Sequence, residues 1–211
     1  MKKIVGLSVV VLFSTMLLVS CTKEPVNHLT QAETRIYITN HDSAVNFAAF
    51  HTFSVADSVA VIENNQLVQK DLNAFDAQFI TALKTAIQQR GYTLVDKSSN
   101  PDLAINVSRI YNNYSGVVSY TDYWGDYYGY WDPYYWGYPG YNYYFPTYYG
   151  VYSISEGGLS VDMFDLKDAA SNNELKYLWS GLVRGEGVFV PANIDNHVKT
   201  LFDQSVYIKT N

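Results

Sequence analysis

The residue with the clearest chemistry in this chain is Cys21, its only cysteine. Two lysines follow the first methionine, an apolar run extends from Ile4 to Val19, and the small residue Ser20 stands directly before the cysteine. A basic start, an apolar centre and a small residue at the end are the layout of a secretory signal peptide. The run is too short and wrongly flanked for a stable membrane span. We therefore expect residues 1–20 to be a cleaved signal peptide.

The position of Cys21 resembles the lipobox of bacterial lipoproteins, in which the cysteine is diacylated on sulfur and acylated again at its new amino group. The resemblance implies a membrane anchor, because each buried methylene contributes about 0.8 kcal/mol and more than one acyl chain makes anchoring stable. The alternative is an incidental or buried thiol in an ordinary secreted protein. Thr22 is not aspartate, so the familiar inner-membrane retention signal is absent and the resemblance favours the outer membrane.

Other residue types used in catalysis show no comparable pattern. The sequence has no nucleophile elbow, no phosphate-binding glycine loop and no zinc-protease motif. Asp162 and Asp165 lie on an expected hairpin strand, where the simplest interpretation is that they face solvent. We therefore expect no catalytic residue, no metal site and no cofactor. The histidines share no ligand spacing; they are His28, His41, His51 and His197.

A tract rich in tyrosine is the candidate for a specific function. Of the 20 tyrosines, 16 lie between Tyr111 and Tyr152, with three of the four tryptophans. No lysine or arginine occurs from Ile110 to Leu166, which argues against binding to anionic lipid. Such a long insertion between regular elements is usually functional or disordered. We expect the insert to span about residues 111–156.

Three interpretations of this tract compete. Tyrosine and tryptophan give large contact area at low entropic cost, so the tract could form an interaction surface for a protein or a glycan. It could instead be a low-complexity segment that associates with other copies of itself. It could also be an insertion that folds onto the sheet or stays mobile, without a ligand. The candidate interaction surface comprises Tyr123, Trp124, Tyr127, Tyr128, Trp131, Tyr135 and Trp136.

Composition narrows the class of protein. The mature chain would have 191 residues, enough for one domain with its own core. Loss of Lys2 and Lys3 with the signal peptide leaves 12 basic against 20 acidic residues, a formal charge of −8. An acidic chain without basic clusters is a poor nucleic-acid binder. A single cysteine excludes an intramolecular disulfide and a cysteine-based zinc site.

The hydrophobic pattern predicts the elements around the tract. Apolar residues recur at three- and four-residue steps over residues 72–90, which predicts a helix with Asp71 as its cap and Gly91 just beyond its end. A second helix is predicted from Pro191 to about Ser205. The predicted strands are residues 35–39, 44–54, 103–108, 159–163 and 176–183.

These elements follow the order β-β-α-β-(Tyr-rich insert)-β-β-α. The order indicates an α+β fold, with a mainly antiparallel sheet of about five strands and two helices packed on it. Residues 21–34 would be a lipidated tether, and residues 35–211 a single α+β domain.

Several segments together resemble a known family. They are Cys21, residues 45–53, Gly91-Tyr92, residues 100–103, and the hairpin formed by residues 158–165 and 178–181. They look like the Gram-negative lipoprotein family catalogued as domain of unknown function four thousand one hundred and thirty-six (DUF4136). The resemblance covers about Arg35 to Tyr207, apart from the tyrosine-rich tract.

The chain departs from the family pattern at three positions. Asn46 replaces an acid, Phe50 replaces a tyrosine, and Ser180 replaces the usual basic residue after the tryptophan. The resemblance supports a lipoprotein with an α+β architecture and implies no reaction.

These observations lead to one functional expectation and one alternative. We expect an outer-membrane-anchored lipoprotein, facing the periplasm or the cell surface, that is not an enzyme and serves as an envelope structural or interaction module. Its expected partners are the membrane, through the N-terminal lipid anchor, and an envelope protein or glycan. The alternative is a glycan-binding module or weak hydrolase that acts on envelope polysaccharide. The oligomeric state is left open.

Overall fold

The computed structural model describes residues 30–64, 66–111, 133–144 and 157–210, together with the backbone of residues 118–119 and 151–152. The expected signal peptide, Cys21 and most of the tether lie outside these residues. The described residues after Thr30 belong to one compact unit, Gln31–Asn211. Among the described helices, none is long and apolar enough to cross a bilayer.

This unit is built around a nine-stranded mixed sheet. Its strands are β1 (Ile36–His41), β2 (Thr52–Val55), β3 (Val59–Glu63), β4 (Gln66–Asp71), β5 (Thr93–Leu94), β6 (Leu103–Tyr111), β8 (Asn142–Tyr144), β10 (Gly158–Asp165) and β11 (Glu174–Arg184). A separate two-stranded sheet pairs β7 (Val118–Ser119) with β9 (Val151–Tyr152). The helices in the described ranges are α2 (Gln31–Thr34), α3 (Ala74–Gln88), α5 (Ala169–Asn172) and α6 (Ile194–Asp203). The 3₁₀ turns are η1 (Phe47–Ala49), η2 (Lys97–Ser99), η4 (Pro133–Trp136) and η5 (Pro191–Asn193).

The sheet is antiparallel at its centre and parallel toward one side. The strands β1, β11, β10 and β6 are neighbours in that order, and each pair is antiparallel. Both β2 and β3 pair parallel with β6, β5 pairs parallel with β2, and β8 pairs parallel with β11. A hairpin joins β3 to β4. The prediction of a mainly antiparallel sheet of about five strands is therefore wrong in strand number and orientation, although the combination of sheet and helices is confirmed.

These differences have local physical causes. The strands β3 and β4 are joined at a turn in which Asn64 adopts a left-handed φ of 50°, so the sheet gains a hairpin that the hydrophobic pattern did not predict. Residues 44–51 do not form a strand, because the Asn46 side chain accepts a hydrogen bond from the Ala48 N–H and caps η1. The strands β5 and β8 are only two and three residues long, too short to leave a pattern in the sequence.

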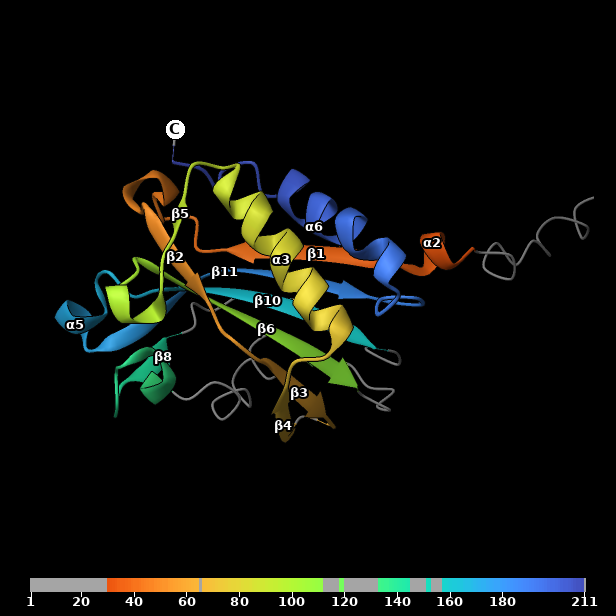
Figure 1. Ribbon diagram of the computed structural model, residues 1–211, viewed down its shortest axis with the longest axis horizontal. Helices are drawn as coiled ribbons and strands as arrows, with labels where there is room; N and C mark the ends of the chain where they lie inside the picture. Colours follow the sequence, from red (N-terminus) through yellow and green to blue (C-terminus); the bar gives the residue numbers. More distant parts are fainter. Residues whose placement is uncertain are drawn as a thin grey trace, which may run out of the picture. The chain divides into compact units, whose positions relative to one another are not determined.

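One face of the sheet is covered by α3 and α6, which lie side by side over it (Figure 1). The predicted helical period is confirmed, since Phe79, Leu83 and Ile87 of α3 are all buried in the main hydrophobic core. Trp179 of β11 holds the end of α6 against the sheet. Its ring stacks on Phe202 with a centroid separation of 5.7 Å, and its Nε1–H donates to Ser205 Oγ at 2.8 Å. Each fully buried side chain of this kind contributes about 1.5–3 kcal/mol.

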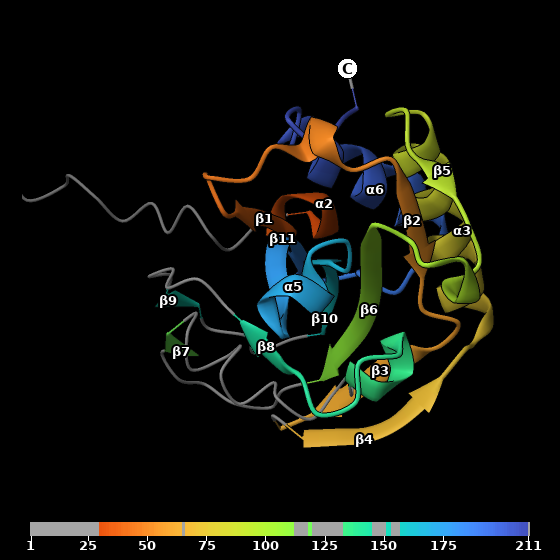
Figure 2. The same cartoon turned by 90° about the vertical axis from the view of Figure 1, so that its left-hand side faces the viewer.

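The opposite face of the sheet is also covered. Every residue of β6 from Leu103 to Ile110 is buried, which requires apolar layers on both sides of the strand. The second layer is a separate hydrophobic cluster that includes Trp136 and Tyr143. Both residues belong to the tyrosine-rich tract, and Figure 2 shows residues 133–144 on the side of the sheet away from α6. This part of the tract is therefore a layer of the fold.

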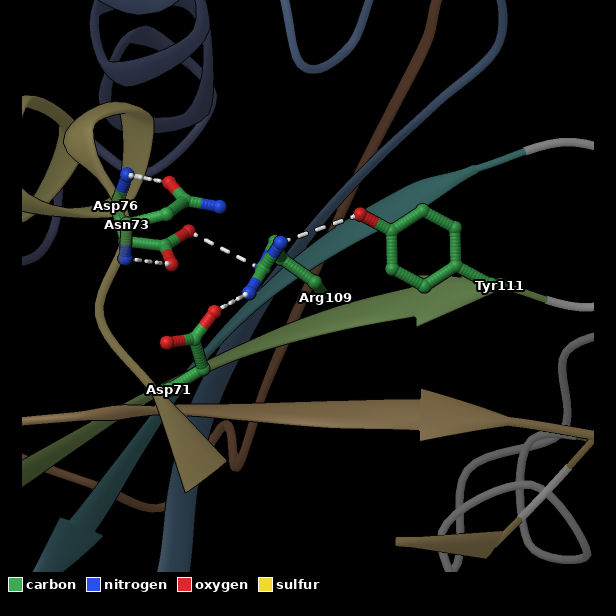
Figure 3. A network of polar contacts seen from close by, with 5 residues as sticks. All are labelled: Asp71, Asn73, Asp76, Arg109 and Tyr111. Carbon is green, nitrogen blue, oxygen red and sulfur yellow. Dashed lines mark hydrogen bonds and ion pairs between the residues drawn. The ribbon is translucent and has the colours of Figure 1, made fainter. Parts of the chain in front are cut away.

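An ion-pair network fixes the beginning of α3 to β6 (Figure 3). The Arg109 guanidinium lies 2.9 Å from Asp71 Oδ2 and 3.2 Å from Asp76 Oδ1, and it donates a hydrogen bond to the Tyr111 hydroxyl at 3.3 Å. Asp76 and Asn73 form a capping box, in which each side chain accepts the backbone N–H of the other residue. The cap of α3 is thus Asn73, whereas the predicted cap, Asp71, binds Arg109.

Asp76 is the most constrained acid in this network, because its side chain is fully buried. Burial raises the pKa of its carboxyl, while the Asn73 N–H and the Arg109 charge act to lower it. An ionised carboxylate in such a place depends on a cation, since an unpaired buried charge is costly. Arg109 therefore supports the helix cap as well as the contact with β6.

We predict that Arg109→Met lowers the free energy of unfolding by about 3–5 kcal/mol, the cost of leaving one partner of a buried ion pair alone. Urea unfolding followed by circular dichroism measures this loss. The control is Lys199→Met, which removes the exposed ion pair between Lys199 and Asp203 and should cost about 0–1 kcal/mol. Equal losses in the two variants would contradict a special role for Arg109.

Candidate functional site

Two residues of the predicted interaction surface, Tyr135 and Trp136, lie in the described part of the chain, both in η4. The other members, Tyr123, Trp124, Tyr127, Tyr128 and Trp131, lie outside it. Trp136 is buried, and its Nε1–H donates to Asn106 Oδ1 of β6 at 3.2 Å. Its indole is thus part of the second core and is not presented to a partner.

The rest of residues 133–144 is tied to the same face of the sheet. The Tyr138 hydroxyl donates to the Leu166 carbonyl at 3.0 Å, and the Tyr143 ring lies 4.7 Å from that of Phe164 between centroids. The strand β8 pairs with residues 174–176 of β11. For residues 133–144, these contacts favour the interpretation that the insertion folds onto the sheet.

A row of buried polar side chains lies on this second face. Asn106, Asp162 and Ser180 stand opposite one another on β6, β10 and β11. All three are at most 2% exposed, and Ser160 Oγ lies 3.3 Å from both oxygens of Asp162, to which it can donate one hydrogen bond. Burial raises the pKa of Asp162 well above its usual value. Ser180 is the position at which the family usually has a basic residue, so Asp162 faces a hydroxyl here instead of a cation.

The prediction that Asp162 and Asp165 face solvent is therefore wrong. Asp165 is also buried, and its Oδ1 accepts a hydrogen bond from the Asp168 N–H at 3.0 Å, which fixes the turn after β10. Burial raises the pKa of this carboxyl too. For Asp162, the alternation of the strand gave no sign of burial, because the layer that covers its face comes from elsewhere in the chain. Asp165 has the parity of Met163, which packs in the main core, and it is buried at the end of β10.

Of the three histidines that the structure describes, His197 is the fully buried one, and both of its ring nitrogens bind groups of the fold. His197 Nε2 lies 3.1 Å from the Val188 carbonyl, which can only accept, so Nε2 carries the proton. Nδ1 then accepts from the Tyr37 hydroxyl at 2.9 Å. Burial lowers the pKa of His197, in keeping with this neutral form. No group of three or more histidine, cysteine or acidic side chains within the described ranges could hold a metal ion.

Several segments that carry the family resemblance are joined to one another by hydrogen bonds and stabilise the fold. Asp102 Oδ2 accepts the N–H groups of His51 and Thr52 at 2.7 and 3.1 Å, and Thr52 Oγ1 accepts the Asp102 N–H in return. The Tyr92 hydroxyl donates to the Phe47 carbonyl at 3.0 Å. Gly91 has a φ of +96°, the left-handed conformation expected for it. These residues join β2, β6 and α3 and enclose no open site.

An open groove adjoins Tyr135, with a volume of about 640 Å³. The Tyr135 hydroxyl accepts the Asp57 N–H at 3.0 Å, and the Lys97 ammonium lies 3.8 Å from the ring centroid. We call this cavity the Tyr135 groove. Its polar lining comes from four separate segments of the chain and comprises Ser54, Asp57, Lys84, Asp96, Lys97, Ser99 and Tyr135. Only Tyr135 could be found from sequence, since nothing in the spacing of the others predicts that they meet.

A second groove, of about 570 Å³, lies between α3 and α6. Ala82 and Ala86 line it, with Arg90 among its polar residues. The Arg90 guanidinium donates to the Phe202 carbonyl at 2.7 Å and the Ile208 carbonyl at 3.2 Å. Carbonyls at the end of a helix lack partners within the helix, so Arg90 is a capping group here. The Tyr135 groove is therefore the better candidate for a functional site.

We predict that Asp162→Asn makes the protein more stable above about pH 4, and that the gain grows with pH. A raised native pKa means that the folded chain holds a proton which the unfolded chain loses as pH rises past 3.8, so stability falls through this interval. The asparagine removes that titration. Urea unfolding from pH 4 to pH 8 tests this, with the exposed Asp96→Asn as control. A constant difference from the wild type across the range would contradict it.

A family model and a solved structure match this chain over most of its length. The model of the family described as domain of unknown function (DUF4136) matches residues 38–205. A crystal structure of a DUF4136 family protein from Bacteroides thetaiotaomicron is 27% identical and has a TM-score of 0.68, and the match covers 84% of this chain and 99% of that one. No curated protein matches the sequence.

Two other solved structures have lower sequence identity and lower TM-scores. A PDZ domain protein from Parabacteroides distasonis is 14% identical with a TM-score of 0.41, and the match covers 83% of this chain and 37% of that one. The PelC dodecamer from Paraburkholderia phytofirmans is 9% identical with a TM-score of 0.40, and the match covers 84% and 99% of the two chains. The family match spans most of the chain and confirms the resemblance read from its segments. This chain belongs to the DUF4136 family, whose molecular function is unknown.

Proposed function

We propose that this protein is a lipoprotein held at the outer membrane by acylated Cys21, and that it acts as a non-enzymatic interaction module of the envelope. The observation that carries the anchor is the single cysteine, placed directly after the apolar N-terminal run and its small residue. Thr22 at the next position favours the outer membrane, by resemblance to other lipoproteins. Two or more acyl chains would hold the domain stably at the bilayer.

The assignment of a non-enzymatic role rests on what the reactive side chains do. The buried His197 and Asp165 are each hydrogen-bonded to backbone groups of the fold. Asp162 lies beneath the second core, and Asp102 joins the start of β2 to the start of β6. These four groups, which could otherwise transfer a proton, are buried in the fold or hydrogen-bonded to its backbone.

The interaction role rests on the tyrosine-rich tract. Residues 133–144 pack on the sheet and give the tract a fixed base, with Tyr135 at the edge of an open groove. Aromatic side chains held in place lose little entropy on binding, which suits them to recognition. A partner could be an envelope protein or a glycan, and the polar lining of the Tyr135 groove favours the glycan.

We predict that the wild-type chain incorporates a palmitate analogue and fractionates with the outer membrane, whereas Cys21→Ser does neither. The expected cause is loss of the thiol that receives the diacyl group. The measurement is metabolic labelling with an alkyne fatty acid, followed by separation of the two membranes on a density gradient.

The matched control is Thr22→Asp, which should remain acylated but shift to the inner membrane. A wild-type protein that is unacylated and free in the periplasm would contradict the anchor.

A further inference from the structure

We propose that the Tyr135 groove binds an anionic saccharide, that is, a sugar chain whose residues carry a carboxylate, sulfate or phosphate group. The inference rests on the proposed role as an envelope interaction module and names the class of its ligand. It depends on three features of the groove: a fixed aromatic wall, two lysines without a carboxylate partner in the described part of the chain, and a surrounding set of hydroxyl and carboxylate groups.

The aromatic wall is held rigidly. The Tyr135 hydroxyl accepts the Asp57 N–H at 3.0 Å, so one end of the ring is tied to the turn between β2 and β3. The ring also meets Trp136 edge to face, with centroids 4.9 Å apart, and Trp136 is itself bound to Asn106. The Lys97 ammonium now lies over this ring, 3.8 Å from its centroid. A pyranose whose C–H groups stack on the ring would displace that ammonium, which then binds the anionic group of the sugar, while the ring itself stays fixed at little cost in entropy.

Three lysines lie at or beside this groove, and the two that line it balance the charge of the two lining aspartates, Asp57 and Asp96. Lys97 lies 3.8 Å and Lys70 lies 5.8 Å from the centroid of the Tyr135 ring, and Lys84 of α3 lines the cavity. These three lysines come from separate elements, whereas the tract that supplies Tyr135 has no lysine or arginine of its own.

Two of these cations lack a carboxylate partner among the described residues, and Lys97 contacts only the Tyr135 ring in the interactions found for it. In the part of the chain that the structure describes, neither Lys84 nor Lys97 has a carboxylate within ion-pair distance. An ammonium group with no carboxylate partner can form charge-assisted hydrogen bonds with an anionic group that enters the groove. A carboxylate, sulfate or phosphate group would satisfy this requirement.

The remaining polar groups favour a ligand with hydroxyls over a bare anion. Asp57 and Asp96 would repel a compact, highly charged ion, but their oxygens can accept hydrogen bonds from sugar hydroxyls. Ser54 and Ser99 can both donate and accept. The volume of about 640 Å³ lies within the usual range for small-molecule sites. A sugar residue with one negative group matches all of these features together.

The test is isothermal titration calorimetry of the detergent-solubilised mature protein with tetragalacturonate, cellotetraose and inorganic phosphate. We expect tetragalacturonate to bind and the two other probes to give no measurable heat of binding. Lys84→Ala and Lys97→Ala should each weaken binding about tenfold, as expected for one lost charge-assisted hydrogen bond. Lys199→Ala removes an exposed lysine of α6, with a side chain 72% exposed, and should leave the affinity unchanged.

Several outcomes would overturn the proposal. Absence of tetragalacturonate binding, equal binding of cellotetraose, or equal binding of phosphate would each exclude an anionic saccharide as the ligand. A loss with Lys199→Ala as large as with Lys97→Ala would place binding elsewhere. These results are independent of the test of the lipid anchor. If the protein is acylated and in the outer membrane but binds no saccharide, the proposed function stands and the saccharide proposal fails. If the protein binds the saccharide but is not acylated, the saccharide proposal stands and the anchor fails.

Discussion

The fold depends on one constraint: its central strands are buried on both faces, so the sheet needs two covers. The helices α3 and α6 supply the first and are fixed by Trp179 on β11 and Arg109 on β6. The second cover includes Trp136 and Tyr143 from the tyrosine-rich tract, which pack with Phe164 and Tyr177. The tyrosine-rich tract has the sequence of an insertion, but over residues 133–144 it is part of the hydrophobic core. Without it, Phe164, whose ring centroid lies 4.7 Å from that of Tyr143, would lose part of its cover.

This second cover also explains the unusual chemistry beneath it. Asp162 and its neighbours Asn106 and Ser160 lie where polar groups are expensive, so they must satisfy one another. The Trp136 indole extends this set by binding Asn106. Tyr135, the next residue along the chain, points to an open groove at the other side of the same turn. A single short turn thus joins the interior of the domain to its candidate binding surface.

The sequence was sufficient to predict an element where the hydrophobic period within that segment determines its secondary structure. The helices α3 and α6 and the central strands β6, β10 and β11 were predictable, because their apolar residues recur with a regular step. The short strands β5 and β8 were not, since pairing with a neighbour creates them. For the same reason Trp136 and Tyr135 could not be told apart in sequence, although one is buried and the other lines a groove. Lys84 and Lys97 gave no signal at all, because only the folded chain brings them to Tyr135.

The most direct test of this account is hydrogen–deuterium exchange of the β6 and β10 amides, read by mass spectrometry. Trp136→Ala should speed their exchange, since truncation of a buried tryptophan costs about 3–5 kcal/mol. Tyr134→Ala, at a side chain 71% exposed in the same turn, should leave exchange unchanged. Unaltered protection of β6 and β10 in Trp136→Ala would contradict the claim that residues 133–144 are the second cover of the sheet.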